Sequence, residues 1–577
     1  MDDLLTRPGP RPPEVIAPPP RVVPGRPSGE SAGRRRRVEQ AKRASRRLAA
    51  WDHFDALVLV LLGALALGLR WRSLWTSYWG DEAIAIGIAL HPVKSLPHYL
   101  ANDGSPPLFY VMLHFWVRLF GKSEPATHAL SMVPGLLAIP AAWWSGDRLF
   151  GRRAARGAAA LVATCAYLDY YSTETRMYSW LVLTALLAVT CFILAYRGAP
   201  RRYWVAATLL MVAGLYLQYY GLYLLAATVL VGSAVAASSR SWPRLRATLL
   251  YGAACTAAFL PWVPQFLYQF DNTGAPWAPR PSVLDLFGDS FNALASAAWA
   301  AIVIAIAVAV LCRRDLAPKA LAPEAPTGAG PAMLGGSSLT GSPVVLAAGV
   351  SLITLLLAWF VGQFVNSWNP RYLGIAVVPA LVPLAGALVR ARWGALALWT
   401  AVAAMACTAI PVVVDRSVTD QTSKSDAAYL LDHLRPELRP GALVISTEVT
   451  DAPVLAVDLG ARFRYATPFG LLKDPLVVNW SDISTRLQGT DAASNLAPLL
   501  AALPVGGQVL VVNPTTWGGG ETPENYAGPV EAEAIAANQT VLNDPQLQPE
   551  VTELVPKYSD PLYPMEASLF VKTGSHG

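Results

Sequence analysis

Two adjacent carboxylates, Asp81 and Glu82, end the aromatic stretch WTSYWGDE at residues 75–82. A carboxylate can act as a general base by taking the proton of a hydroxyl group, and aromatic rings offer faces on which a sugar can stack. Tryptophan and tyrosine also gather at membrane–water interfaces, where neighbouring acids are simply solvated. The stretch leaves two interpretations open: a catalytic site for a hydroxylated substrate, or an interfacial aromatic belt.

A polar turn, NDGSPPLFY at residues 102–110, places Asp103 and Ser105 just before a Pro-Pro pair. Proline suits the first turn of a helix, so helix initiation alone explains the pattern. An aspartate in front of a membrane helix could also hydrogen-bond a substrate. We therefore include Asp103 and Ser105 in the predicted substrate-binding set.

Glu174 and Arg176 stand in the stretch YYSTETRMYSW at residues 170–180, between two apolar segments. Ionisable groups near membrane depth are costly and are therefore functional candidates, although a structural ion pair explains them equally well. An arginine here could bind a phosphate through two N–H groups. Tyr171 and Tyr178 flank the pair and join the predicted binding set.

Arg371 and Tyr372 end a short polar loop, NSWNPRY at residues 366–372. The arginine either snorkels to the membrane surface or makes a second phosphate contact. Tyr220, in QYYG, marks a helix break on the same predicted side and joins the substrate-binding set.

Motifs for metals and nucleotides are missing from the sequence. His91 and His98 have no third ligand at a suitable spacing, so we predict no metal site. There is no D-x-D, no G-x-x-x-x-G-K-[ST] and no G-x-G-x-x-G after a strand, so we predict no nucleotide donor and no cofactor. A lipid phosphate fits as the activated donor, because its tail can enter between helices while its head meets arginines.

The composition is that of a membrane protein. Of 577 residues, 54% are hydrophobic and only 15% are charged, against about 25% charged in soluble chains. This excludes a disordered protein or one that coats nucleic acid, and it argues against a soluble multidomain enzyme. The expected partners include a lipid bilayer and no nucleic acid.

Formal charge divides the chain into three regions. Residues 1–50 carry +7, residues 51–414 carry +9 and residues 415–577 carry −10. We predict a disordered basic cytoplasmic tail over 1–50, a transmembrane catalytic domain over 51–414 and a soluble extracytoplasmic α/β domain over 415–577. In the last region, hydrophobic patterns predict a helix and strands. The helix is expected at 424–435 and the strands at 442–449, 508–513 and 567–572.

Apolar segments predict about 11 transmembrane helices, since a span needs about 20 apolar residues. The segments lie at residues 54–69, 106–120, 126–146, 154–170, 176–196, 203–218, 221–238, 247–268, 291–311, 343–365, 371–389 and 393–414. Arginine clusters between them place the N-terminus inside and loop 70–105 outside, by the positive-inside rule. The count then follows if segment 106–120 enters the membrane only partly, or if residues 106–146 cross it once overall.

Together these stretches resemble the GT-C membrane glycosyltransferases, above all bacterial relatives of dolichyl-phosphate-mannose protein mannosyltransferases and of lipid A aminoarabinose transferase. The likeness runs through about residues 70–390 and rests on GDE, DGSPPLFY, YYSxExRMY, LPWVPQ and PRYLG in that order. It implies sugar transfer from a polyprenyl phosphate, with Asp81 at the catalytic position and Glu82 beside it. It also implies that Arg176 and Arg371 lie near the donor phosphate. Ser105 is a departure, because several relatives carry His or Lys there.

We therefore predict a glycosyltransferase of a bacterial cytoplasmic membrane, with Asp81 as general base and Glu82 and Glu174 as orienting groups. The resemblance implies mannose as the sugar; direct displacement inverts the anomeric centre, and the acceptor is an extracytoplasmic glycan or glycolipid. An arabinofuranosyltransferase using polyprenyl-phosphate arabinose is an alternative within this class. A lipid-linked-sugar transporter and a glycan-binding assembly protein are alternatives of other classes. Ionisable residues concentrated at the outer loops favour the enzyme.

Overall fold

The computed structural model describes residues 53–295, 342–391, 393–418, 424–515, 523–555 and 563–574. The predicted basic tail and most of the predicted segment 291–311 lie outside these residues.

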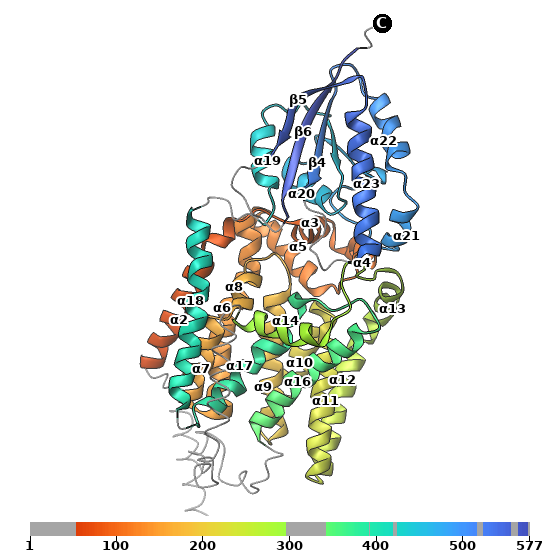
Figure 1. The fold of residues 1–577 in the computed structure, drawn as a ribbon. Coiled ribbons are helices and arrows are strands. Elements are labelled where there is room, and N and C mark those ends of the chain that lie inside the picture. The colour runs from red at the N-terminus through yellow and green to blue at the C-terminus, as the bar shows by residue number, and fades with distance from the viewer. Residues whose placement is uncertain are drawn as a thin grey trace, which may run out of the picture. The chain divides into compact units, whose positions relative to one another are not determined.

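The described chain up to residue 418 is helical (Figure 1). Its first helices are α2 (His53–Arg70), η1 (Arg72–Trp75), α3 (Gly80–Leu90), η2 (Val93–Ser95), α4 (Leu96–Asp103), α5 (Leu108–Phe120), α6 (Glu124–Phe150), α7 (Arg152–Ala163) and α8 (Ala166–Tyr171). These are followed by α9 (Tyr178–Tyr196), α10 (Arg202–Leu217), α11 (Tyr220–Ser238), α12 (Trp242–Phe259), η3 (Leu260–Trp262), α13 (Val263–Asn272) and α14 (Val283–Ala295). The last are α16 (Pro343–Gly362), η9 (Pro370–Tyr372), α17 (Gly374–Leu388) and α18 (Gly394–Val418).

Six helical stretches in the described residues are long and apolar enough to cross a bilayer. They are His53–Trp75, Glu124–Phe150, Tyr178–Tyr196, Tyr220–Ser238, Trp242–Asn272 and Pro343–Gly362. Helix α5 has 13 residues and is therefore about 20 Å long, too short for a hydrocarbon core of about 30 Å. This agrees with the predicted partial entry of segment 106–120, while the total of 11 crossings stays a prediction.

Two segments differ from their predicted form. The predicted outer loop 70–105 contains α3 and α4, and α3 packs against a helix of the soluble domain. Helix α3 has 11 residues, of which those after Glu82 are apolar; it is too short to span a membrane but suits burial under another domain. The predicted segment 154–170 is broken, because α7 ends at Ala163 and α8 begins at Ala166.

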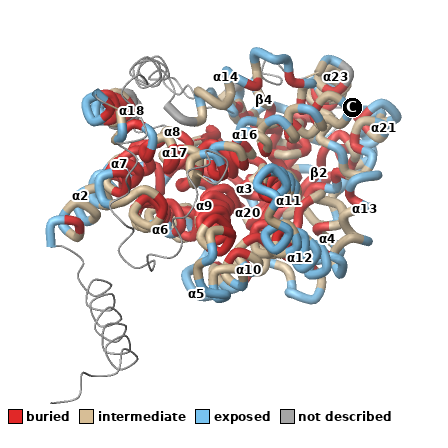
Figure 2. Tube along the Cα trace, turned by 90° about the horizontal axis from the view of Figure 1, so that it is seen from below, coloured by how far each residue is buried: buried red, intermediate tan, exposed pale blue. Residues whose placement is uncertain are grey.

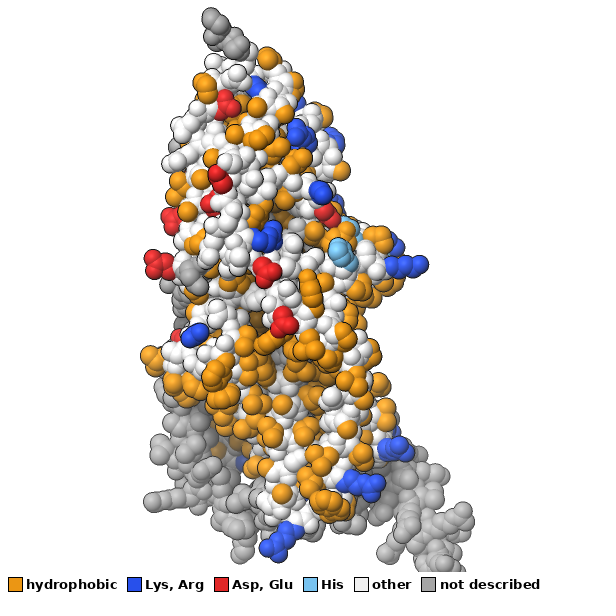
Figure 3. All heavy atoms as spheres, turned by 90° about the vertical axis from the view of Figure 1, so that its right-hand side faces the viewer, with side chains coloured by type: hydrophobic (Ala, Val, Ile, Leu, Met, Phe, Trp, Pro, Cys, Tyr) orange, Lys and Arg blue, Asp and Glu red, His pale blue; other side chains and the backbone are white. Residues whose placement is uncertain are grey.

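The helices pack around α9 and α17, which are buried along most of their length, while α2 and α12 are largely exposed (Figure 2). Hydrophobic side chains cover the helical part, and charged side chains lie above and below them (Figure 3). Exposed arginines occupy the turns between α9 and α10 and between α11 and α12, as Arg201 and Arg240 do. This end of the helices is therefore basic.

The C-terminal region is an α/β domain, as predicted. Its sheet has the order β3-β2-β1-β4-β6-β5, in which β1 is parallel to β2 and β4, and β6 is antiparallel to its neighbours. The strands are β1 (Leu443–Ser446), β2 (Arg464–Thr467), β3 (Gly470–Leu471), β4 (Gln508–Pro514), β5 (Leu547–Leu554) and β6 (Met565–Lys572). The helices are α19 (Ala427–Leu434), α20 (Asp451–Leu459), α21 (Ile483–Gln488), α22 (Ala492–Ala501) and α23 (Glu524–Leu542).

Alternating side chains of the sheet build two cores. Val444 and Leu510 pack with α19 and α20 on one face, and Leu443 and Val509 pack with α22 and α23 on the other. This alternation is the two-residue period of a strand. The predicted helix at 424–435 and the three predicted strands are confirmed as α19, β1, β4 and β6.

Helix α3 lies close to the backbone of the soluble domain at Gly87. A Cβ atom added there would lie 1.8 Å from the carbonyl oxygen of Leu476. We expect Gly87→Ala to lower the melting temperature of the purified protein in detergent, because overpacking against backbone costs about 1–3 kcal/mol. Gly68→Ala is the matched control, since its added Cβ meets nothing within 4 Å. An unchanged melting temperature for Gly87→Ala would contradict this close approach.

Candidate active site

The N-terminus of α3 positions the two predicted carboxylates. Trp79 is the N-cap in an extended conformation, and Asp81 and Glu82 lie in the first turn, where the helix dipole favours negative charge. The Asp81 side chain is 21% exposed, whereas Glu82 is fully buried. Only Asp81 therefore remains open to an incoming substrate.

Both predicted arginines meet Asp81. Arg371 Nη1 lies 2.5 Å from Oδ2 of Asp81, and Arg176 Nη2 lies 4.0 Å from the same oxygen. Arg176 Nη1 also donates to the backbone carbonyl of Asp81 at 3.2 Å. Asn369 holds the other arginine in place, because its Oδ1 accepts a hydrogen bond from Arg371 Nε at 3.0 Å.

Asp103 joins the same network through a tyrosine. The hydroxyl of Tyr110 donates to Oδ2 of Asp103 at 2.7 Å, and Arg176 Nη1 donates to that hydroxyl at 3.4 Å. Burial raises the pKa of Asp103, and the charge of Arg176 opposes this. Ser105 is buried nearby, and its carbonyl accepts from Gln269 Nε2 at 3.1 Å.

The predicted tyrosines form a continuous aromatic group. The ring centroids of Tyr171 and Tyr178 are 5.1 Å apart, those of Tyr178 and Tyr372 are 6.0 Å apart, and those of Tyr220 and Tyr372 are 4.9 Å apart. The guanidinium of Arg176 lies over the Tyr178 ring at 5.9 Å. The group therefore connects the arginines to the starts of α9, α11 and α17.

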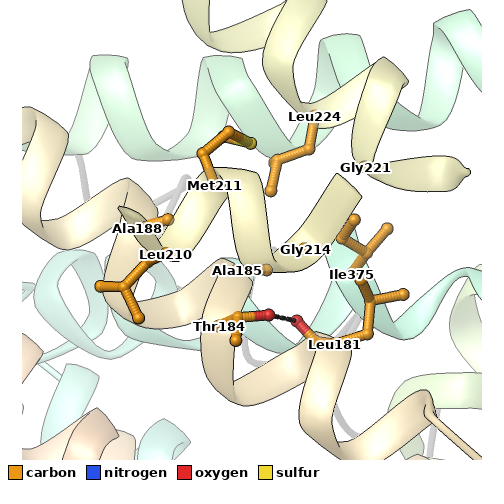
Figure 4. A pocket seen from close by; sticks show the side chains of 10 residues that line it. All are labelled: Leu181, Thr184, Ala185, Ala188, Leu210, Met211, Gly214, Gly221, Leu224 and Ile375. Atoms are coloured by element: carbon orange, nitrogen blue, oxygen red, sulfur yellow. Dashed lines mark hydrogen bonds between the residues drawn. The ribbon is translucent and has the colours of Figure 1, made fainter. Parts of the chain in front are cut away.

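A small, mostly apolar hollow lies between the helices (Figure 4). It is formed by α9, α10, α11 and α17, and its wall includes Leu181, Gly221 and Ile375. These follow Tyr178, Tyr220 and Tyr372 in sequence. The helices that begin at the tyrosines thus line the hollow further along.

Glu82 lies beneath the site in a set of polar contacts that the sequence did not reveal. Its Oε1 accepts from Lys424 Nζ at 2.7 Å and from the backbone N–H of Thr175 at 2.7 Å, and lies 2.9 Å from Nε2 of His128. Burial would raise the pKa of Glu82, but the charges and hydrogen bonds of Lys424 and His128 lower it. Lys424 and His128 carry no local sequence signal, and Lys424 is 342 residues from Glu82.

Trp79 connects the site to the soluble domain. Its ring stacks on Tyr563 with centroids 4.8 Å apart and an angle of 4° between the planes. The guanidinium of Arg371 lies 5.2 Å from the centre of the Trp79 ring. Within the described residues, no three His, Cys, Asp or Glu side chains are grouped so that they could hold a metal ion.

Glu174 is a buried carboxyl whose Oε2 has no hydrogen-bond partner among the described residues. Burial raises its pKa to about 7, against the opposing charge of Lys424. Between the ordinary value of 4.5 and 7, the folded protein therefore keeps a proton that the unfolded chain has lost. The contribution of Glu174 to the free energy of unfolding must then fall as the pH rises through that range.

We expect the melting temperature of Glu174→Gln minus that of the wild type to increase from pH 5 to pH 8, because the amide cannot ionise. Thermal melting in detergent at a series of pH values measures this difference. Glu531→Gln is the matched control, because Glu531 is exposed on α23. A difference between Glu174→Gln and the wild type that is constant with pH would contradict the raised pKa.

Comparison with known proteins gives matches in sequence and in structure. Residues 104–267 match the family described as dolichyl-phosphate-mannose-protein mannosyltransferase. No curated protein matches the sequence.

Among solved structures, ArnT from Cupriavidus metallidurans is similar in two forms. Its apo form has a TM-score of 0.54 at 14% identity, covering 88% of this chain and 97% of that one. Its form bound to undecaprenyl phosphate has a TM-score of 0.55 at 13% identity, covering 90% and 98%. The chain therefore has the fold of the GT-C membrane glycosyltransferases, with a C-terminal α/β domain, as its motifs predicted.

Proposed function

We propose that the protein is a membrane glycosyltransferase that moves a sugar from a polyprenyl phosphate to a hydroxyl group of an extracytoplasmic glycan or glycolipid. The observation that carries the proposal is the accessible carboxylate of Asp81 between the guanidinium groups of Arg176 and Arg371. This set pairs a proton acceptor with two cations that suit a phosphate leaving group.

In the proposed reaction, the acceptor oxygen attacks the anomeric carbon as the bond from that carbon to the phosphate oxygen breaks. Asp81 takes the acceptor proton, and the polyprenyl phosphate leaves with the electron pair of the broken bond. Direct displacement inverts the anomeric centre. A guanidinium has five N–H groups, so Arg176 and Arg371 can bind phosphate while they keep Asp81 oriented.

Ser105 leaves the position before the Pro-Pro pair without a basic residue. Arg176 and Arg371 both reach Oδ2 of Asp81, and they are the cations that we assign to the phosphate. Asp103 holds Tyr110, which in turn contacts Arg176. We propose that Asp103 and Tyr110 hold the side chain of Arg176 in position.

The lipid tail is proposed to leave the site past Tyr178, Tyr220 and Tyr372 toward the apolar hollow. In its wall, Gly221 lets α11 pack against the backbone of Gly214 and Leu215 on α10. The structural likeness to ArnT bound to undecaprenyl phosphate supports a lipid phosphate as the donor. The basic opposite end of the helices supports a site on the extracytoplasmic face of a bacterial cytoplasmic membrane.

Mannose is the proposed sugar, supported by the matched mannosyltransferase family. Arabinofuranose is the second candidate within the class. The test is incubation of the purified protein with polyprenyl-phosphate mannose, polyprenyl-phosphate arabinose and a panel of glycan acceptors, followed by product analysis. Transfer from either donor supports the proposal, and the product identifies the sugar and the linkage. No turnover with any donor would favour a transporter or a glycan-binding protein.

Asp81→Asn is expected to lower kcat by about 10²–10⁴-fold, the range that a general base contributes. The protein should keep its melting temperature, because Asp81 is partly exposed. Asp271→Asn, at an exposed position on α13, is the matched control and should retain activity. Full activity of a folded Asp81→Asn protein would exclude this residue as the base.

Arg176→Met and Arg371→Met are each expected to raise the donor KM and lower kcat by at least tenfold, because each removes a cation from the phosphate site. Arg371→Lys should recover only part of the loss, since an ammonium cannot reproduce two parallel N–H contacts. Arg118→Met, exposed on α5, is the control. Steady-state kinetics with varied donor concentration measure the effects, and unchanged donor kinetics would place the phosphate elsewhere.

A further inference from the structure

A lysine of the soluble domain reaches beneath the candidate active site. The Lys424 side chain is only 7% exposed. Its Nζ donates to Oε1 of Glu82 at 2.7 Å and to the carbonyl oxygen of Thr173 at 2.8 Å, and lies 3.4 Å from Nε2 of His128. One ammonium group thus contacts α3, α6 and the turn at residues 172–177.

The backbone around Lys424 is held on both sides. Ser77 Oγ donates to the carbonyl of Ser425, and Ser425 Oγ donates to the carbonyl of Tyr78, each at 2.5 Å. On the other side, the backbone N–H of Tyr563 donates to the carbonyl of Lys424 at 3.1 Å. The docked soluble domain therefore fixes where this lysine enters the helical part.

Lys424 and Glu82 together set the distance between the two segments that carry the reacting groups. Glu82 belongs to the first turn of α3, next to Asp81, and accepts from the backbone N–H of Thr175 at 2.7 Å, next to Arg176. Lys424 also links α3 to the turn at residues 172–177, because its Nζ donates to both Glu82 and the carbonyl of Thr173. Without the ammonium, the buried carboxylate would lose a compensating charge and would move or take up a proton.

We propose that Lys424 is a positioning residue of the transfer reaction. It compensates the charge of Glu82 and holds the turn at 172–177, so that Asp81 and Arg176 face each other only while the soluble domain is docked. The kinetic part of this inference rests on the proposed function. The ionisable groups that face Lys424 are Glu82 from α3, His128 from α6 and Glu174 from the turn.

The experiment uses the full-length protein in detergent and four variants: Lys424→Met, Glu82→Gln, the double variant, and Lys122→Met. Lys122 is the matched control, because its Nζ donates to the carbonyl of Val457 across the same domain boundary and its charge acts on Asp458, away from Glu82. We expect Lys424→Met to lower kcat at least tenfold and Lys122→Met to keep the wild-type kcat. The double variant should recover part of the loss, because it leaves no uncompensated carboxylate, although the bond to Thr173 stays absent.

The pH dependence separates this role from a merely structural one. In Lys424→Met, Glu82 is left in the interior without its ammonium, so it should be neutral at low pH and charged at high pH. The ratio of kcat for Lys424→Met to that for the double variant should therefore fall as the pH rises from 6 to 8. A packing defect would lower both variants by the same factor at every pH.

Wild-type kcat in Lys424→Met, or a double variant no more active than Lys424→Met, would overturn the inference. Absence of turnover by the wild type with every donor would instead be a failure of the proposed function. In that case melting temperatures test the pairing of Lys424 with Glu82. A double variant that melts at a higher temperature than Lys424→Met supports the pairing. Decreases in melting temperature that simply add in the double variant overturn it.

Discussion

The site depends on keeping one negative charge inside a protein interior. Glu82 is fully buried, and a carboxylate in such surroundings is stable only where donors and positive charge compensate it. Its neighbours come from distant parts of the chain: Lys424, His128 and the backbone of Thr175. Removing one partner of a buried ion pair costs about 3–5 kcal/mol. The same charge that is costly to bury therefore holds these parts against the start of α3.

Burial of Glu82 also explains how two adjacent carboxylates differ. Consecutive residues of a helix point about 100° apart, because a turn takes 3.6 residues. With Glu82 turned inward, Asp81 faces Arg176 and Arg371 and stays partly exposed. Phosphate leaves as a stabilised anion, so the proposed reaction needs one open carboxylate. A glycosidase, by contrast, places two carboxyl groups on its substrate.

The sequence was sufficient to predict the charged residues that are proposed to meet the substrate. Asp81, Arg176 and Arg371 are separated by up to 290 residues, yet each stands beside an apolar segment on the same predicted side. A bilayer confines such charges to its surfaces. Charged residues that are predicted on the same side of the membrane are therefore expected at the same depth in the structure. The same argument located Asp103 and the tyrosines. In the soluble domain, two-residue alternation was enough to identify β1, β4 and β6.

The partners of Glu82 could not be predicted in the same way. The sequences around Lys424 and His128 are those of ordinary surface residues. Only the tertiary fold brings the two side chains to Glu82. Residues 70–105 gave no spanning signal, yet α3 is buried because the soluble domain covers it, with Gly87 against the backbone of Leu476. Position along the membrane normal can be inferred from local composition, whereas compensation of an interior charge depends on which domain docks above it. The soluble domain is therefore part of the site's construction, and a sequence comparison restricted to the membrane segments would miss the residue that completes it.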